Sequence, residues 1–583
     1  MSTQVTKPTR DQPASSRADP DAPRAKSRLA SRLFIAALAA AMLPVVVAAV
    51  RALARHWIPL SDDAFFVVRA HDVFNQHRPL LGLWSSASLT AGSNLNHPGP
   101  LLFDALAVPV RLFGGSAGVV IGIACVNALA VAGVAWFAYR RGGALVGTAG
   151  VAVAAVLCWT LGSEVLFEPW QPYSMLLPFL FFLVLVWSIM CGDFLALPFA
   201  AGVGSLILQT HLSYSLLVPV LAVGALGGLV LVLVSDRRRA PDAWPARRRS
   251  AVRAGAIAGA VAAICWVQPI IEEFTSDGPG NLTRLWRSFG STPSDTVGLS
   301  LAVKLMTSVV ALPPWWLRPS FRDAWVKGAI FAPPRSVDVP SGLLALTALV
   351  VLFGILGLWA WRARRVHDRT TLAAVATAVL ASGTGVATAA RIPLRPFGIA
   401  AHQFRFIWPI GAFVGLALLL GLCRLLTADR RRVSLVVGCL AAITLAVAVW
   451  NIPTSHQTPT TSFYEPSIPI ARALDRQMGS LEGKGPLLVD DLFHHGLGNP
   501  FDATVLAELQ RRDVPFVAKD AMLVRQLGPE RRSTGKNARA VLLLGIGPEA
   551  KNPPQGARRV AFVSSDRGDV ALYLAPLDES SKR

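Results

Sequence analysis

Long apolar segments alternate with short polar and basic stretches from about residue 33 to residue 452 of this chain. Most of these segments are close to the ~20 residues that a helix needs to cross a bilayer. The pattern predicts eleven membrane spans, at 33–53, 115–139, 143–161, 173–191, 194–211, 213–234, 251–271, 341–361, 370–390, 403–426 and 433–452.

Arginine clusters lie between the predicted spans and indicate the side that each connection faces. Lys and Arg concentrate in the cytoplasmic connections of membrane proteins. A cytoplasmic N-terminus and an odd number of crossings place every cluster in the cytoplasm and leave the C-terminus outside. These clusters lie at 140–141, 237–239, 247–249, 362–365 and 430–432.

Two further apolar stretches do not fit the pattern of spans. Residues 297–312 are interrupted by Lys304, and a crossing there would reverse the side of the arginines that follow. We therefore expect a helix at the outer interface, with Trp315 and Trp316 at headgroup level. Residues 97–113 are short and bounded by Pro and Gly, which favours a surface helix or a partial insertion.

The composition is typical of an integral membrane protein. Of 583 residues, 53% are hydrophobic and only 16% are charged. The net charge of +21 belongs mostly to the cytoplasmic connections, so it does not indicate a nucleic-acid partner. All six cysteines fall in or at the ends of apolar segments, which predicts no disulfides. The heavy use of Ala, Arg, Gly and Val is typical of a high-GC bacterium such as an actinobacterium.

Both ends of the chain are polar, and the two ends differ in kind. Residues 1–32 have almost no large apolar side chains, which predicts a disordered cytoplasmic tail before a retained first span. Residues 33–453 form the predicted membrane domain. Residues 454–583 contain five strand-like runs between helical patterns and predict a small extracytoplasmic α/β domain. The fold class is thus a polytopic α-helical protein of the plasma membrane with a C-terminal α/β domain.

The predicted outer connections, at 56–114, 162–172, 272–340 and 391–402, are longer than the inner ones, so an active site is expected on the outer face. Asp62 and Asp63 come just after the first span, where a carboxylate can act as a general base toward a lipid-borne substrate. The alternative is local: Ser61 can cap a helix, and acidic residues are favoured in its first turn.

Other polar groups of these connections are candidates for substrate binding. Asn96 and His97 precede a short apolar helix, which Pro98 and Pro100 can simply start. Glu164 and Glu168 can bind a cation or sugar hydroxyls, and Gln171 lies beside them. Trp170 can stack on a sugar or anchor the interface. His211 ends the fifth span, where polar groups either bond to one another or line a cavity.

A basic group precedes the tenth span, against the bias that keeps positive charge inside. It contains Arg391, Arg395, His402 and Arg405. Outer cations need a partner, and a phosphate on a lipid carrier supplies one whose geometry suits the arginine fork. A structural role for these cations is the alternative.

Taken in order, these motifs resemble the GT-C superfamily of polytopic glycosyltransferases, and more narrowly its actinobacterial cell-envelope members. The resemblance covers about residues 30–450. It rests on Asp62-Asp63, Asn96-His97-Pro98-Gly99-Pro100-Leu101, Glu168-Pro169-Trp170-Gln171-Pro172, Gly280-Asn281-Leu282 and His402-Gln403-Phe404-Arg405.

The resemblance implies inverting transfer of a sugar from a polyprenyl-phosphate donor to a polysaccharide, glycolipid or glycoprotein acceptor, with arabinofuranose or mannose as the sugars to try. Asp62 or Asp63 would be the catalytic base. Arg405, His402 and Arg395 would bind the donor phosphate. A divalent cation is optional in this scheme, and no ligand set for one is assigned. The soluble C-terminal domain would help to bind polymeric acceptors.

Two alternatives come from other classes of protein. A flippase or transporter of lipid-linked sugars also needs many helices, but it predicts internal repeats or charged groups at midplane, and the charges here gather at the outer ends of the spans. A non-catalytic scaffold for envelope assembly would make the outer carboxylates and arginines replaceable.

Overall fold

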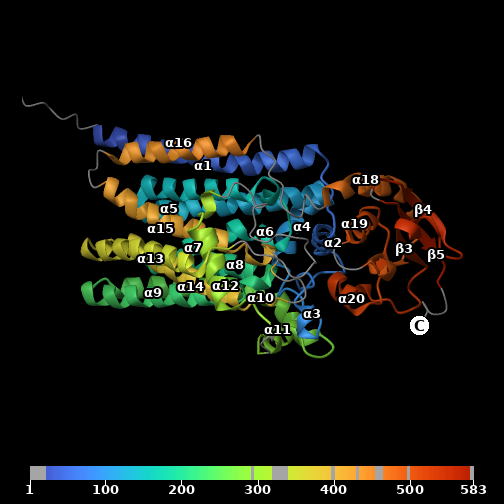
Figure 1. Cartoon of the computed structure of the whole chain (residues 1–583). Coiled ribbons are helices and arrows are strands. Elements are labelled where there is room, and N and C mark those ends of the chain that lie inside the picture. Colours follow the sequence, from blue (N-terminus) through green and yellow to red (C-terminus); the bar gives the residue numbers. More distant parts are fainter. Residues whose placement is uncertain are drawn as a thin grey trace, which may run out of the picture.

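A computed structural model describes residues 22–290, 295–317, 339–394, 399, 401–427, 432–452, 464–495, 499–566 and 568–577. Long helices run side by side through most of the molecule, and a small sheet with its own helices caps one end of them (Figure 1). The predicted tail is described only from residue 22, and there it is helical. Ala, Arg, Lys and Leu in this stretch are good helix formers, so the first helix extends beyond its apolar part.

Nine of the described helices are long and apolar enough to cross a membrane. Their outward faces carry large apolar side chains, such as Leu231, Ile264 and Leu343, each more than two thirds exposed. Such surface is stable only against lipid or protein. The helices of the bundle are α1 (Ala22–Ala54), α5 (Gly115–Leu161), α7 (Leu176–Met190), α8 (Ala196–Thr210), α9 (Leu217–Arg239), α10 (Trp244–Thr275), α13 (Gly342–Arg365), α14 (Arg369–Ala390), α15 (Ile407–Leu426) and α16 (Val433–Asn451).

Helix α5 is a hairpin of two helices rather than one rod. Its 47 residues would be about 70 Å long if straight, twice the thickness of a bilayer core. Gly142 and Gly143 leave the helical conformation, and the φ of 63° at Gly143 suits glycine. Across this turn, a Cβ on Gly150 would lie 2.9 Å from the Cβ of Ala138. The two halves therefore pack against each other, as the predicted spans 115–139 and 143–161 require.

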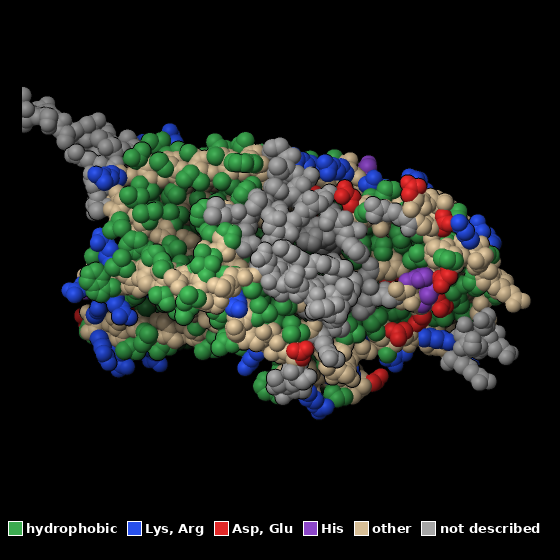
Figure 2. Space-filling model, viewed as in Figure 1, with side chains coloured by type: hydrophobic (Ala, Val, Ile, Leu, Met, Phe, Trp, Pro, Cys, Tyr) green, Lys and Arg blue, Asp and Glu red, His purple; other side chains and the backbone are tan. Residues whose placement is uncertain are grey.

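With α5 counted twice and the 15-residue α8 included, each of the eleven predicted spans has a helix among the described residues. The prediction of a polytopic α-helical membrane protein is confirmed. Figure 2 shows hydrophobic side chains over the flank of the bundle, with Lys and Arg gathered at the end away from the sheet.

Shorter helices fill the spaces between these spans. They are α2 (Asp62–Asp72), α3 (Ser88–Ala91), α4 (Leu101–Phe113), α6 (Gln171–Ser174), α11 (Asn281–Gly290) and α12 (Gly298–Val310). Helix α12 is about 20 Å long, too short to cross a bilayer core of ~30 Å. Of the two tryptophans predicted at headgroup level, Trp315 is 3% exposed and packs on Gly411 of α15, so its side chain contacts protein; its level in the membrane stays a prediction. Trp316 is half exposed.

The C-terminal residues form a five-stranded mixed sheet in the order β2-β1-β3-β5-β4. β1 pairs in parallel with β2 and β3, whereas β5 pairs antiparallel with β3 and β4. The prediction of a small α/β region is confirmed, with all five expected strand segments present. The elements are α18 (Ile468–Gln477), β1 (Leu487–Leu488), α19 (Asp502–Arg511), β2 (Phe516–Val517), α20 (Ala521–Leu527), β3 (Ala540–Ile546), β4 (Arg558–Val563) and β5 (Val570–Ala575).

A buried ionic group joins α2 to this C-terminal region. The carboxylate of Asp72 is fully buried and accepts hydrogen bonds from Arg69 at 2.8 Å, Arg531 at 2.9 Å and Gln510 at 2.8 Å. A buried carboxylate is tolerated only when partners of this kind replace its water. Asp72 thereby fixes α2, and the residues at its start, against the sheet region.

Candidate active site

Asp62 and Asp63 are the first two residues of α2, at the end of the bundle that the C-terminal region covers (Figure 1). Ser61 does not cap the helix through its side chain, and its φ of 52° lies in the left-handed region. Its backbone N–H instead donates to the carbonyl of Pro500 at 3.3 Å. The local capping explanation is therefore unsupported at Ser61, although the helix N-terminus still favours the two carboxylates.

Trp170 orients Asp62. The indole Nε1 donates a hydrogen bond of 3.0 Å to Oδ2 of Asp62, whose side chain reaches solvent. The Trp170 ring also lies 5.0 Å from the ring of His402 and 4.8 Å from that of Tyr173. Three distant segments of the sequence thus meet at one point. Trp170 contacts all of them, which is more than anchoring at the membrane interface requires.

The two aspartates at the start of α2 both have raised pKa values, for partly different reasons. The protein atoms packed around the Asp62 carboxylate raise its pKa above its ordinary value although the side chain also reaches solvent, and the bond from Trp170 partly opposes this rise. Burial raises the pKa of Asp63 well above its ordinary value, and the charges of Glu168 and Asp62 add to the effect. Asp63 is half-buried and Glu168 is 3% exposed. Asp62 is therefore the carboxylate of this group that combines access to solvent with a raised basicity.

The C-terminal region adds two groups that the sequence pattern does not indicate. The hydroxyl of Tyr464 is hydrogen-bonded to Ser61, and its pKa is raised by burial and by the charges of Asp62, Asp502 and Asp63. Burial, reinforced by the charge of Asp62, raises the pKa of Asp502 to about 8. In the sequence, Asp502 stands at the start of a helical pattern, where an acidic residue is unremarkable. No local signal placed it beside Asp62.

Glu164 lies in a different electrostatic setting. Burial raises its pKa to about 7, and the charges that act on it are those of Arg55, Glu465 and Arg51. Gln171 is buried at the start of α6. Of the two glutamates that the sequence paired, the structure brings Glu168 to the aspartates.

Asn96 belongs to a polar junction between three segments. Its side-chain oxygen accepts from Nε of Arg525 at 2.9 Å, and its backbone N–H donates to Asn281 at 2.9 Å. Arg525 also donates to Asn281 at 3.1 Å and lies 3.7 Å from Glu272. These contacts of Asn96 are structural, and among the described residues they join it to Gly82, Asn281 and Arg525 rather than to Asp62 or Asp63.

His97 stacks on His211, with ring centroids 5.1 Å apart. His97 is buried, and burial together with the nearby His211 lowers its pKa well below its ordinary value. The structure thus brings together two histidines that the sequence suggests separately for substrate binding, as stacked rings whose surroundings favour the neutral form of His97. His211 also lies 6.3 Å from the Tyr214 ring, so both histidines are part of an aromatic cluster.

The predicted phosphate-binding cations are unequally placed. His402 is half-buried in the 3₁₀ turn Ala401–Phe404 and faces Trp170. Arg405 is fully buried, with its guanidinium 4.6 Å from the Trp408 ring. Arg391 is exposed, and Arg395 lies outside the described residues. His402 is therefore the member of this group beside the carboxylates, with Arg405 in the core beneath the same turn.

No family model matches this chain, and no curated protein matches it in sequence. Among solved structures, it is similar to ArnT from Cupriavidus metallidurans bound to undecaprenyl phosphate. The TM-score is 0.49 at 15% identity, over 93% of this chain and 97% of that chain.

The chain is also similar to the oligosaccharyltransferase of Archaeoglobus fulgidus in complex with Zn and sulfate, with a TM-score of 0.39 at 12% identity, over 76% of this chain and 55% of that chain. For AglB from the same organism, in complex with an inhibitory peptide and a dolichol-phosphate, the TM-score is 0.35 at 13% identity, over 76% and 58%. Likenesses at these scores establish neither a family nor an activity.

Proposed function

We propose that this protein is a membrane glycosyltransferase that moves a sugar from a polyprenyl-phosphate donor to a hydroxyl group of a cell-envelope glycan or glycolipid. The observation that carries the proposal is the solvent-accessible carboxylate of Asp62, oriented by Trp170 and raised in pKa by its surroundings. A base of this kind, at the end of a membrane bundle, suits proton abstraction from an acceptor presented near lipid.

In the proposed reaction, Asp62 takes the proton of the acceptor hydroxyl. The oxygen of that hydroxyl attacks the anomeric carbon of the donor sugar at the same time. The bond from that carbon to the phosphate oxygen breaks, and the electron pair leaves with the polyprenyl phosphate. Attack opposite to the leaving group inverts the anomeric centre. The raised pKa strengthens Asp62 as a base, provided that it is ionised at the working pH.

Charge develops on the phosphate as it leaves, so a cation or a proton donor nearby lowers the barrier. His402 is the candidate for direct contact, because it shares Trp170 with the base. Arg405 would contribute a fixed positive charge from the core beneath the same turn. Arg395 remains a candidate on sequence grounds alone.

We propose that the site faces the outside of the cell. The arginine-rich connections support this orientation, since Figure 2 has Lys and Arg at the end of the bundle opposite the sheet. The C-terminal region, through Tyr464 and Asp502, would then border the site and receive the acceptor.

The test is transfer by the full-length protein, purified in detergent, with a panel of polyprenyl-phosphate sugars that includes arabinofuranose and mannose. We expect turnover of at least one donor by the wild type, loss of turnover in Asp62→Asn, and wild-type turnover in the matched control Asp277→Asn, which alters an exposed carboxylate. Full activity of Asp62→Asn would overturn the assigned base. If the same protein, reconstituted into vesicles, moves a lipid-linked sugar across their membrane and no transfer is found, the flippase is favoured instead.

A further inference from the structure

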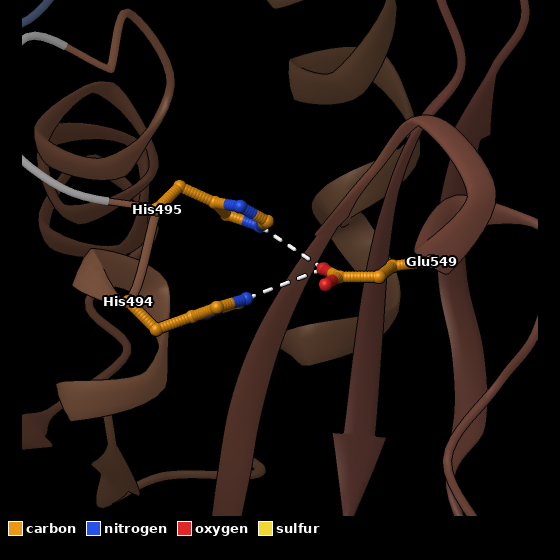
Figure 3. A group of neighbouring side chains, drawn as sticks. All are labelled: His494, His495 and Glu549. Carbon is orange, nitrogen blue, oxygen red and sulfur yellow. Dashed lines mark hydrogen bonds and ion pairs between the residues drawn. The ribbon is translucent and has the colours of Figure 1, made fainter.

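A second group of chemically active side chains lies on the C-terminal region, apart from the carboxylates of α2. His494 and His495 follow the 3₁₀ turn Asp490–Phe493, and Glu549 belongs to the turn Gly547–Ala550 after β3. Both imidazoles point at the Glu549 carboxylate (Figure 3), with Nε2 of His494 at 3.2 Å and Nε2 of His495 at 3.3 Å from the same oxygen. Among the described residues, this is the group of His, Cys, Asp and Glu whose ligand atoms come close enough to hold a metal ion.

The hydrogen bonds around His494 decide which of its nitrogens is free to bind. Its Nδ1 contacts the carbonyl of Asp491, which can only accept, so Nδ1 carries the proton. In the neutral ring Nε2 then presents a lone pair to Glu549, which is also an acceptor. Two acceptors 3.2 Å apart are satisfied by a second proton on the ring or by a metal ion between them. A second hydrogen bond that fixes the tautomer in this way is the usual support of a metal-binding histidine.

His495 brings another acceptor to the same place. Its Nε2 lies 2.9 Å from the carbonyl of Leu544 as well as near Glu549. A single proton on this nitrogen would be shared between the two oxygens, whereas a metal ion bound at Nε2 can be ligated by nitrogen and oxygen together. The oxygen atoms around both histidines are therefore stabilised by a positive charge placed among them.

The two nitrogen-to-oxygen spacings fit ligands held tetrahedrally around one small ion. Ligands bound tetrahedrally at ~2.0–2.1 Å, as His and Glu bind Zn²⁺, stand about 3.3–3.4 Å from one another. The two nitrogen-to-oxygen distances here are 3.2 and 3.3 Å. The two imidazoles favour Zn²⁺ over Mg²⁺ or Ca²⁺, and a carboxylate completes the kind of ligand set that Zn²⁺ takes in proteins.

We propose that His494, His495 and Glu549 form a zinc site with one coordination position open to solvent. The open position follows from the exposure of the ligands, since the side chains of His494 and Glu549 are 43% and 58% exposed. The bound ion would tie the turn after β1 to the turn after β3. This proposal is independent of glycosyl transfer.

The zinc site would also steady a contact with the membrane part of the protein. Phe493, next to His494, stacks on Phe65 of α2 with ring centroids 6.0 Å apart. Zinc bound at His494 and His495 holds this turn in place, and binding that is exclusive to the folded state raises its stability. We therefore expect zinc to raise the unfolding temperature of the full-length protein.

The experiment uses the full-length protein in detergent, purified with a tag that lacks histidine, stripped with EDTA and then titrated with Co²⁺ and Zn²⁺. The wild type should bind one ion per chain. Bound Co²⁺ should give the visible absorption of four-coordinate cobalt, and this absorption should disappear when Zn²⁺ displaces it. His494→Ala and Glu549→Gln should each weaken binding by about 100-fold or more, because loss of a supporting group alone costs 10–100-fold.

Glu482→Gln is the matched control, since it neutralises a carboxylate of similar exposure elsewhere in the same region. It should bind Zn²⁺ as the wild type does. Glu549→Gln changes only an exposed side chain, so the test stands even where His494→Ala folds poorly. Equal Zn²⁺ affinity in Glu549→Gln and wild type, or the absence of stoichiometric binding to the wild type, overturns the zinc site and leaves an ordinary His–Glu ion pair.

Discussion

The indole of Trp170 donates a hydrogen bond to the carboxylate of Asp62, a residue 108 positions earlier in the chain. This bond defines the orientation of the proposed base relative to the bundle. It also distinguishes Asp62 from Asp63, which has carboxylate neighbours rather than a donor.

The first prediction separates the two aspartates. Asp62→Asn should lower kcat by about 10²–10⁴, the usual contribution of a general base. Asp63→Asn should change kcat by less than tenfold, because the raised pKa of Asp63 already favours its neutral form, which Asn resembles. Initial rates with the active donor measure both. A larger loss in Asp63→Asn than in Asp62→Asn would reverse the assignment.

The second prediction concerns the pH profile of Trp170→Phe. This change keeps a ring beside His402 and removes the donor to Asp62. The bond lowers the pKa of Asp62, so its loss should raise that pKa further. Since the base must be ionised, the acid limb of kcat/KM should move to higher pH. An unmoved acid limb would show that Asp62 is not the titrating group. Trp266→Phe is the control, because it also removes an indole hydrogen bond, to Ser205, and should leave the pH profile as in the wild type.

The third prediction concerns the stability of Asp502→Asn. The pKa of Asp502 is raised to about 8 in the folded protein, above the value of ~3.9 expected when unfolded. The folded state therefore holds a proton that the unfolded state has lost, and stability falls as the pH rises from about 4 to about 8. Asn stays neutral, so the variant should unfold at a higher temperature than the wild type near pH 8, with no gain near pH 4. A gain that does not depend on pH would contradict the titration of Asp502.

The fourth prediction tests the junction at Asp72. Asp72→Ala leaves Arg69 and Arg531 buried without their shared carboxylate. Removal of one partner from a buried ionic group costs about 3–5 kcal/mol, and the C-terminal region should become sensitive to limited proteolysis. Glu482→Ala, which removes an exposed carboxylate elsewhere in the same region, serves as the control. Resistance to protease equal to that of the wild type would indicate that other contacts hold the region.

The membrane helices and the five strands followed from the sequence because length and apolar character are local properties. The α5 hairpin was also predictable, since Arg140 and Arg141 required a turn where two glycines follow. The burial of Trp315 was not, because it depends on the closeness of α12 to Gly411 of α15. That contact joins residues almost a hundred positions apart.

The candidate site was predictable as a set of residues but not as a geometry. Asp62, Glu168, Trp170 and His402 were each selected from their own segments, and the structure joins them. Asn96 was selected for the same site, yet it bonds to Arg525, whose segment carried no motif. Tyr464 and Asp502 were missed for the same reason. Single-sequence patterns report which residues are unusual where they stand, not which distant residue each will contact.

The Asp72 group also limits how this protein can be recombined. Arg531 and Gln510 meet a carboxylate on α2, and Thr504 donates to the carbonyl of Pro59 at 2.9 Å. A chimera that took its C-terminal region from another protein would therefore need to take α2 and the preceding turn as well. The exchanged part would then include the segment that bears Asp62. Replacing the C-terminal region to change the acceptor would therefore replace the proposed base as well.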